Sequence, residues 1–267
     1  MTGGLAGKRL VVVGASAGIG RAVAVRAARE GAELALVARR REPLDQLAQE
    51  IGGATVITAD LSVPDDCARI GEEAARALGA VDVVLFTAAI AHLRTLRELT
   101  AEEWGQTLAT NLVGTSLAIS GLLPHLSDRG LVTVTSSESA GRPFYALGSY
   151  AASKAAVEDM MRAWRTEHPD ARFVTLVVGT TVPTEFANNF DADEMVAAFP
   201  IWAAQGNAPA EYMQVDEVAD VIVGVFGALL PNRSVGMETL FLRSPAPVIG
   251  GTDTMNAAAR ATGNEPV

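Results

Sequence analysis

Short apolar runs rich in Val and Leu alternate along the chain with longer, Ala-rich segments whose apolar residues recur at helical spacing. The runs predict strands over residues 9–13, 34–37, 55–58, 82–86, 131–135, 172–178 and 238–242. The segments between them predict helices up to residue 29 and over 44–51, 65–78, 101–123, 149–166 and 216–230. Strands that are apolar throughout are typical of a parallel sheet covered on both faces. With right-handed crossovers, the pattern predicts a doubly wound, Rossmann-type α/β sheet of about seven strands.

One large domain fits 267 residues better than two small ones. No internal repeat or hinge-like linker divides the chain, so we expect a single domain over residues 1–250. Residues 180–214 mix Asn, Pro and aromatic residues, and we expect a mobile lid there. Residues 251–267 show little periodicity and predict a flexible tail.

The composition argues against several classes of protein. The net charge is 21 − 31 = −10, which gives no support to nucleic-acid binding or to a basic membrane patch. The single cysteine, Cys67, excludes an intrachain disulfide, and no His, Cys and Asp cluster has metal-ligand spacing. The N-terminus lacks the features of a signal peptide, and Asp220 interrupts the longest candidate membrane span. We therefore expect a cytoplasmic protein that acts on small molecules.

A glycine-rich turn separates the first predicted strand from the first predicted helix, with the spacing G-x-x-x-G-x-G. The three glycines allow a sharp exit from the strand, a close approach of a ligand and close packing of the helix on the sheet. The helix N-terminus would present free N–H groups to a pyrophosphate. A ligand-free turn is the alternative, but the place between strand and helix favours a dinucleotide site. The predicted contacts are Gly14, Ser16, Ala17, Gly18, Ile19 and Gly20.

The end of the second predicted strand discriminates between cofactors. A site for NAD places an acidic residue there to bind the adenosine ribose, whereas this chain has Ala38. Arg39, Arg40 and Arg41 follow, and a guanidinium binds a 2′-phosphate in bidentate fashion. A solvated basic turn is the alternative. The pattern favours NADP, with Arg39 and Arg40 as the contacts.

A serine, a tyrosine and a lysine have a spacing with a chemical use. Tyr150 lies thirteen residues after Ser137, and Lys154 lies one helical turn beyond Tyr150 on the same face. An ammonium beside a phenol favours the phenolate and lowers the tyrosine pKa toward neutrality, where proton exchange with an alcohol is efficient. A serine hydroxyl nearby can hold the substrate oxygen.

With these motifs together, residues 7–243 resemble the compact, single-domain branch of the short-chain dehydrogenase/reductase family. The phosphate turn is similar to the family's T-G-x-x-x-G-I-G, with Val13 in place of the threonine. The resemblance implies that Tyr150 is the acid/base, that Lys154 binds the nicotinamide ribose and that Ser137 orients the substrate oxygen. It also implies that Asp60 and Leu61 contact the adenine side, that Ala88 and Ala89 line the cofactor, and that Asn111 supports a water in the proton relay.

Two stretches depart from the family pattern. The family's N-N-A-G after the fourth strand is Phe86-Thr87-Ala88-Ala89 here, and Ala89 in place of glycine crowds the cofactor side. The family's P-G-x-V-x-T after the sixth strand is apparently one residue longer, over residues 178–184. We assign Val182 and Thr184 to the nicotinamide carboxamide, with the register left open.

These residues predict an NADP(H)-dependent oxidoreductase acting on a carbonyl or secondary alcohol. A nucleotide-binding sensor without turnover is the alternative, whereas length disfavours an epimerase of the family's extended branch. His92 could contact substrate, and Glu138 is either a solvated turn residue or an active-site charge. Aromatic residues of the expected lid favour an apolar substrate, without identifying it or the direction of reaction: Phe186, Phe190, Phe199, Trp202 and Tyr212. Surplus apolar residues on helices 101–123 and 149–166, including Met161, predict a homodimer or homotetramer.

Overall fold

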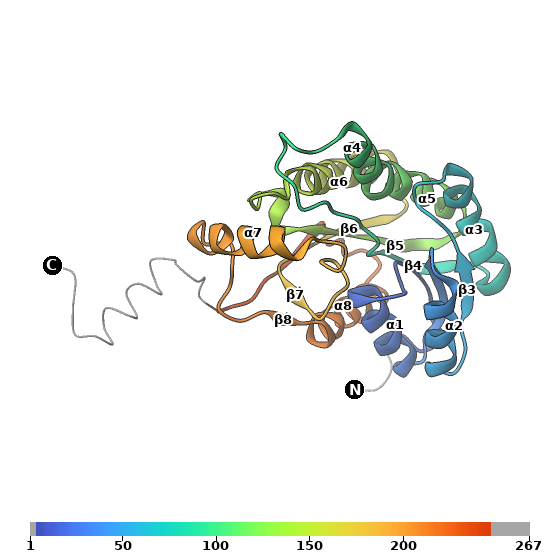
Figure 1. Ribbon diagram of the computed structural model, residues 1–267. Helices are drawn as coiled ribbons and strands as arrows, with labels where there is room; N and C mark the ends of the chain where they lie inside the picture. Colours follow the sequence, from blue (N-terminus) through green and yellow to red (C-terminus); the bar gives the residue numbers. More distant parts are fainter. Residues whose placement is uncertain (1–3, 247–267) are drawn as a thin grey trace, which may run out of the picture.

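Seven strands pair side by side in one parallel sheet, in the order β3-β2-β1-β4-β5-β6-β9 (Figure 1). The computed structural model describes residues 4–246. The order runs outward in both directions from β1 and β4, which is the doubly wound arrangement predicted from the sequence. The strands are β1 Arg9–Val13, β2 Glu33–Ala38, β3 Thr55–Thr58, β4 Val81–Phe86, β5 Leu126–Ser137, β6 Arg172–Val178 and β9 Thr239–Leu242.

Helices cover both faces of the sheet because successive strand side chains point to opposite sides. On β1, Leu10 and Val12 pack with the helices of one face, while Val11 and Val13 pack with those of the other. The first face carries α1 Gly18–Arg29, α2 Arg41–Glu50 and α8 Val215–Leu229. The second carries α3 Pro64–Leu78, α4 Ala101–Leu108, α5 Thr115–Leu122 and α6 Gly148–Glu167 (Figure 1). Two buried layers therefore hold the sheet.

The helix predicted over 101–123 is interrupted. A π-helical turn, η1 Ala109–Gly114, separates α4 from α5, and a short 3₁₀ turn, η2 Leu123–His125, follows. The π turn packs closely against the loop between β3 and α3. A Cβ on Gly114 would stand 1.8 Å from the Leu61 carbonyl oxygen. Such turns are often found at functional sites, and this one carries Asn111.

The continuous helical run Ala101–His125 is long and apolar enough to cross a membrane by length and composition alone. The sequence analysis predicted a helix over 101–123 but took the segment interrupted by Asp220 as the longest candidate span. Part of its apolar surface packs inside the domain, since Ala118, Ile119 and Leu122 are buried in the second core layer. Met161 lies in the same core and is fully buried, so its assignment to a surplus outer face was wrong.

Residues 180–214 hold more regular structure than the sequence predicted. They contain β7 Thr181–Val182, α7 Ala192–Ala204 and β8 Met213–Gln214, with β7 and β8 paired as a separate small sheet. Asp191 caps α7 by accepting hydrogen bonds from the backbone of its first turn. Ala198 of α7 packs with Leu93 and Leu147 in a small third core, which fixes the helix against the loops after β4 and before α6. Mobility of this segment stays a prediction, and the expected tail over 251–267 lies outside the described residues.

Candidate active site

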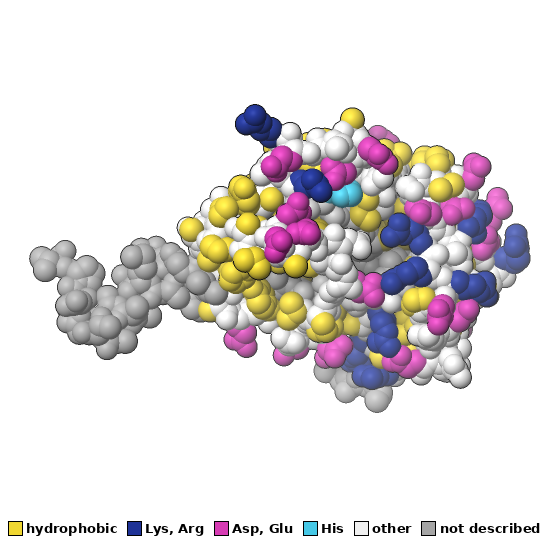
Figure 2. Space-filling view, in the orientation of Figure 1, with side chains coloured by type: hydrophobic (Ala, Val, Ile, Leu, Met, Phe, Trp, Pro, Cys, Tyr) yellow, Lys and Arg dark blue, Asp and Glu magenta, His cyan; other side chains and the backbone are white. Residues whose placement is uncertain are grey.

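A cleft of about 620 Å³ opens at the carboxyl ends of the strands, where the strand order reverses between β1 and β4. Ligands of open α/β sheets bind at this switch point. Figure 2 shows this face, with Lys and Arg side chains gathered toward α1 and α2 and apolar side chains toward α7. The predicted residues that line the cleft are Gly14, Ser16, Ala17, Gly18, Ile19, Arg39, Arg40, Asp60, Leu61, Ala88, Ala89, Ser137, Tyr150, Lys154 and Thr184.

The glycine turn has the geometry that a phosphate site needs. Gly14 has φ +96, and a Cβ there would stand 2.5 Å from the Ala88 nitrogen. Gly20 does not line the cleft. A Cβ on it would stand 2.4 Å from the Gly14 carbonyl oxygen, so this glycine lets α1 pack closely on the phosphate turn. Helix α1 begins at Gly18, with no side-chain cap at Ala17 and no acidic residue in the first turn. The N–H groups of that turn thus face the cleft without a competing carboxylate, which fits a pyrophosphate.

Two arginines and a serine meet at the end of β2. The Arg40 guanidinium lies 3.4 Å from Ser16 Oγ and forms an ion pair with Glu185, which follows β7. Arg39 is more exposed, and its Nη1 lies 3.9 Å from Asp60 Oδ2. Guanidinium and hydroxyl donors converge here beside Ala38, which brings no carboxylate. This arrangement fits the 2′-phosphate of NADP, with Glu185 as a competitor for Arg40 that the sequence did not reveal.

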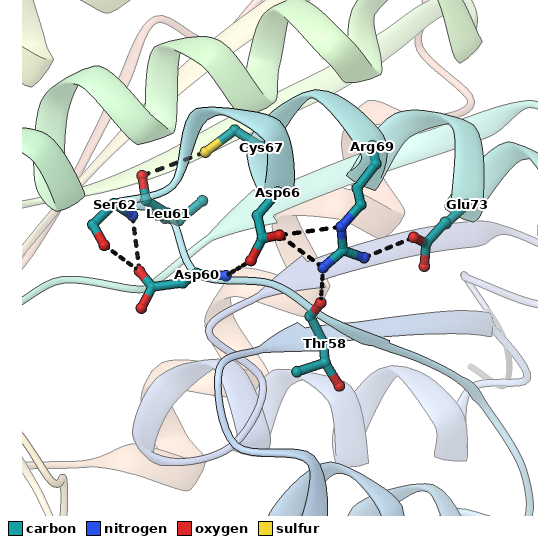
Figure 3. Close-up of polar contacts among 8 residues, drawn as sticks. All are labelled: Thr58, Asp60, Leu61, Ser62, Asp66, Cys67, Arg69 and Glu73. Carbon is teal, nitrogen blue, oxygen red and sulfur yellow. Dashed lines mark hydrogen bonds and ion pairs between the residues drawn. The ribbon is translucent and has the colours of Figure 1, made fainter.

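The loop after β3 is held in place by its own network (Figure 3). The Asp60 backbone N–H donates to Asp66 Oδ2 at 2.8 Å, and the Ser62 N–H and hydroxyl both donate to Asp60 Oδ1. Arg69 bridges from Asp66 to Glu73. The backbone hydrogen bond from Asp60 lowers the pKa of Asp66, so the Asp66 carboxylate stays charged and keeps its hydrogen bonds in this loop. The network presents Asp60 and Leu61 at the cleft wall, and their contact with the adenine stays a prediction.

Ser137, Tyr150 and Lys154 come together at the ends of β5 and α6. Lys154 is buried, and its Nζ donates to the Thr135 carbonyl oxygen at 2.8 Å and lies 5.7 Å from the Tyr150 ring centre. Burial lowers the pKa of Lys154 to about 8 and raises the pKa of Tyr150 to about 12. The prediction that Lys154 brings the Tyr150 pKa toward neutrality is therefore wrong for this arrangement. A hydrogen bond with Ser137 is the interaction that lowers the Tyr150 pKa, and burial outweighs it.

The two adjacent serines face opposite ways, as alternation along a strand requires. Ser136 donates to Glu158 Oε1 at 2.7 Å, on the side of α6. Ser137 Oγ accepts hydrogen bonds from the Ser139 backbone N–H at 3.2 Å and from the Ser139 hydroxyl at 3.0 Å. With both lone pairs engaged, the Ser137 hydroxyl is left to donate its proton, toward Tyr150 or a substrate oxygen.

Three predicted residues lie elsewhere. Asn111 is buried outside the cleft lining, where its amide binds both backbone groups of Ile90 and donates to Ser153 Oγ at 3.0 Å. It braces the loop after β4 against α6, and its support of a water relay stays a prediction. Val182 does not line the cleft, whereas Thr181 and Thr184 do, so the cleft gives no support to Val182 as a contact of the carboxamide, and the role of Thr184 stays a prediction. His92 is also outside the lining and points its Nδ1 toward Glu103, at 3.9 Å.

Several lining residues were not predicted or were judged minor. Glu138, Ser139 and Phe144 follow Ser137 along the chain and line its side of the cleft, and Thr180 faces them from the end of β6. Their closeness to Ser137 in the sequence was a usable signal. Of the expected lid aromatics, Phe186 lines the cleft, while Phe190 and Trp202 pack behind the lining rings.

Comparisons with known proteins agree with this site. A sequence model of the short chain dehydrogenase family matches residues 8–195. Oxidoreductase asL5 of Sarocladium schorii is 30% identical over 223 residues, which cover 81% of this chain and 87% of that protein. Glycine betaine reductase ATRR of Emericella nidulans is 36% identical over 171 residues, 62% of this chain, but the match spans only 14% of that much longer protein.

A solved structure repeats the fold over nearly the whole domain. It is an alcohol dehydrogenase from the archaeon Thermococcus sibiricus complexed with 5-hydroxy-NADP, 28% identical, with a TM-score of 0.76. The superposition covers 89% of this chain and 97% of that one. Fold, phosphate turn, Ser–Tyr–Lys cluster and family match all agree. The chain belongs to the short-chain dehydrogenase/reductase family and is an oxidoreductase of that family.

Proposed function

We propose that this protein transfers a hydride between NADP(H) and a carbonyl or secondary alcohol substrate, with Tyr150 as the acid/base. The observation that carries the proposal is the meeting of Ser137, Tyr150 and Lys154 in the cleft that also holds the phosphate turn. The nicotinamide, when bound, supplies or accepts the hydride. The residues of the chain bind the substrate oxygen, hold its proton and keep the reacting atoms in place.

Protonation favours reduction as the working direction. With a pKa near 12, Tyr150 carries its proton at neutral pH and can donate it to a carbonyl oxygen that gains negative charge. The Ser137 hydroxyl, aimed by Ser139, donates to the same oxygen. Oxidation of an alcohol needs the phenolate, so its rate should rise with pH across the alkaline range, whereas reduction through the protonated Tyr150 should change little until the pH approaches 12.

The adenosine end of the cleft supports NADP over NAD. Arg39, Arg40 and Ser16 offer donors to a 2′-phosphate, and Ala38 brings no acid to the ribose. The archaeal structure was solved with an NADP derivative, which is consistent with this choice. One relative is named for glycine betaine, a quaternary ammonium compound. Because this chain spans so little of that protein, the name alone assigns no substrate here.

The test is NADPH oxidation against a panel of ketones, run beside direct NADPH binding. Turnover supports the proposal, and binding without turnover of any carbonyl supports the nucleotide-sensor alternative. Tyr150→Phe should lower the rate about 10²–10⁴-fold and leave NADPH binding in place, since only the hydroxyl is lost. Ser137→Ala should reduce turnover severely, whereas the matched Ser136→Ala should not, because Ser136 bonds to Glu158. Larger damage from Ser136→Ala would overturn the assigned roles.

A further inference from the structure

Glu138 places a carboxylate in the substrate end of the cleft. It follows Ser137 directly, is half-buried, and packs on the end of β6, where its Oε2 lies 3.2 Å from where a Gly179 Cβ would stand. Its one side-chain partner is the Thr180 hydroxyl, 3.5 Å from Oε1. Within the described part of the chain it forms no ion pair.

The cationic side chains that follow Glu138 along the chain or line the cleft have partners of their own. The guanidinium of Arg142, one turn further along the chain, donates to the Gln205 carbonyl oxygen. The Lys154 ammonium donates to the Thr135 carbonyl oxygen, and Arg40 pairs with Glu185 at the adenosine end. A half-buried carboxylate without a cationic partner keeps part of its hydration and can pair with a positive charge that a ligand brings into the cleft. Glu138 is therefore available to a positively charged substrate group.

Aromatic rings line the same end of the cleft. Phe144, Tyr150 and Phe186 come from the loop before α6, from α6 itself and from the loop after β7. The Tyr150 and Phe186 ring centres are 4.9 Å apart and tilted by 58°. Two further rings pack against the lining rings without lining the cleft themselves. The ring centres of Trp202 and Phe144 are 5.8 Å apart, and those of Phe190 and Phe186 are 5.3 Å apart. Rings combined with a carboxylate form the kind of site that binds an organic ammonium through cation–π and charge interactions.

We propose that the substrate is a carbonyl compound, or its alcohol, that bears an alkylated ammonium group close to the reacting carbon. Glu138 compensates the charge, and Phe186 and Phe144 contact the alkyl groups. This proposal rests on the proposed function and specifies its substrate class. A neutral polyol would donate hydrogen bonds to the carboxylate but would make no cation–π contact with the aromatic rings. A purely apolar ketone would suit the rings but would leave the charge of Glu138 uncompensated.

The test compares two substrates of the same shape. Acetonyltrimethylammonium and its neutral isostere, methyl neopentyl ketone, differ in the central atom of the bulky group and in charge. NADPH oxidation is measured for both with the wild type and with Glu138→Gln, which keeps size and hydrogen bonding but removes the charge. We expect kcat/KM for the cation to fall about ten- to a hundredfold in the variant, mostly through KM. The value for the isostere should be little changed.

Two further variants separate charge at this site from other effects. Glu167→Gln, at the exposed end of α6, removes the same charge from the molecule and should leave kcat/KM for both substrates unchanged. Phe186→Leu keeps an apolar side chain but removes the π face, so it should lower kcat/KM for the cation more than kcat/KM for the isostere. Equal use of the two substrates, with no selective effect of Glu138→Gln, would overturn this inference while the oxidoreductase assignment stands. Failure to oxidise NADPH with any carbonyl would instead overturn the proposed function.

Discussion

At the scale of single residues, burial shifts the pKa of two groups in the candidate active site, and it disfavours the form that Lys154 adopts at neutral pH. The Lys154 ammonium has one backbone acceptor and a pKa near 8, and the Tyr150 hydroxyl has a pKa near 12. Both shifts arise from loss of solvation, which disfavours the charged form of each group. The site thus keeps a neutral proton donor and a desolvated cation side by side, an arrangement that reduces stability in favour of chemistry.

Lys154→Met should stabilise the nucleotide-free protein at neutral pH while it abolishes turnover. The pKa shift from 10.5 to about 8 corresponds to roughly 3 kcal/mol, and the unpaired Thr135 carbonyl offsets about 1–3 kcal/mol of the gain. Between pH 8 and 10.5 the unfolded wild-type chain binds one more proton than the folded one, so wild-type stability rises with pH. The advantage of the variant should narrow across that window in thermal melts.

The matched control is Lys8→Met, because Lys8 is the other lysine of the chain and is partly exposed. It removes one positive charge from a side chain outside the active site, so it measures how far the change in net charge alone alters the melting temperature. A lower melting temperature for Lys154→Met at pH 7 would contradict the assignment of a desolvation penalty to this ammonium.

At the scale of elements, the ends of strands and helices carry both function and stability. The end of β2 leads directly into the arginines that we assign to the 2′-phosphate. The start of β6 carries Arg172, a buried guanidinium that ties this strand to the end of α8. Arg172 satisfies a carbonyl oxygen that the helical hydrogen-bonding pattern leaves free at the end of α8.

Ala38→Asp with Arg39→Leu should shift cofactor preference toward NAD. The change supplies the acid that binds a ribose hydroxyl and removes one charge-assisted contact to a 2′-phosphate, each worth roughly 1.5–3 kcal/mol. The margin for NADPH in the wild type is expected to be modest, because Glu185 competes for Arg40. The measurement is kcat/KM with NADPH and with NADH for both proteins. Equal use of the two cofactors by the wild type would contradict the proposal.

Arg172→Met should destabilise the fold without touching the site. Its Nε donates to the Arg129 carbonyl oxygen at 2.8 Å and its Nη1 to the Leu229 carbonyl oxygen at 2.7 Å. Loss of these donors leaves buried carbonyls unpaired, at about 2 kcal/mol or more in total. For a chain of this size the melting temperature should fall by roughly 4–8 °C. Arg29→Met, at an exposed position, serves as control. An unchanged melting temperature for Arg172→Met would show that the Arg172 hydrogen bonds contribute little to stability.

At the scale of the whole molecule, the helical layer of α4, α5 and α6 presents apolar side chains outward. Val113 is 51% exposed and Leu117 38% exposed, although the opposite side of the same run is buried in the core. Exposed apolar side chains on a helix that is already packed on one face favour a partner surface. We propose that this layer forms the interface of a homodimer or homotetramer.

Light scattering at micromolar concentration should show an assembly larger than one chain. Val113→Glu with Leu117→Glu should shift it toward the monomer, because charges would be buried in the interface. Val221→Glu on α8 changes an equally exposed apolar residue on the opposite face and should leave the assembly intact. A wild type that is monomeric under these conditions would rule out the proposal.

The order of strands and helices followed from the sequence because their periodicity is a local property of the chain. Apolar runs such as Arg172–Val178 predict buried strands without knowledge of their neighbours. The glycine turn and the Tyr150–Lys154 spacing were readable for the same reason, since a strand end and one helical turn fix their geometry. The π-helical turn at Asn111 and helix α7 were not, because contacts with distant segments stabilise them.

Tertiary structure alone decided the electrostatics of the site. Sequence spacing placed Lys154 beside Tyr150 but could not reveal that burial dominates both pKa values, because desolvation depends on everything packed around a group. It likewise could not reveal that Glu185 reaches Arg40 across 145 positions, or that Glu138 meets Thr180 in a cleft that aromatic rings also line. The sequence by itself determined the family and the fold and predicted which groups react; the packing of distant segments decided the environment, and so the charge, of those groups.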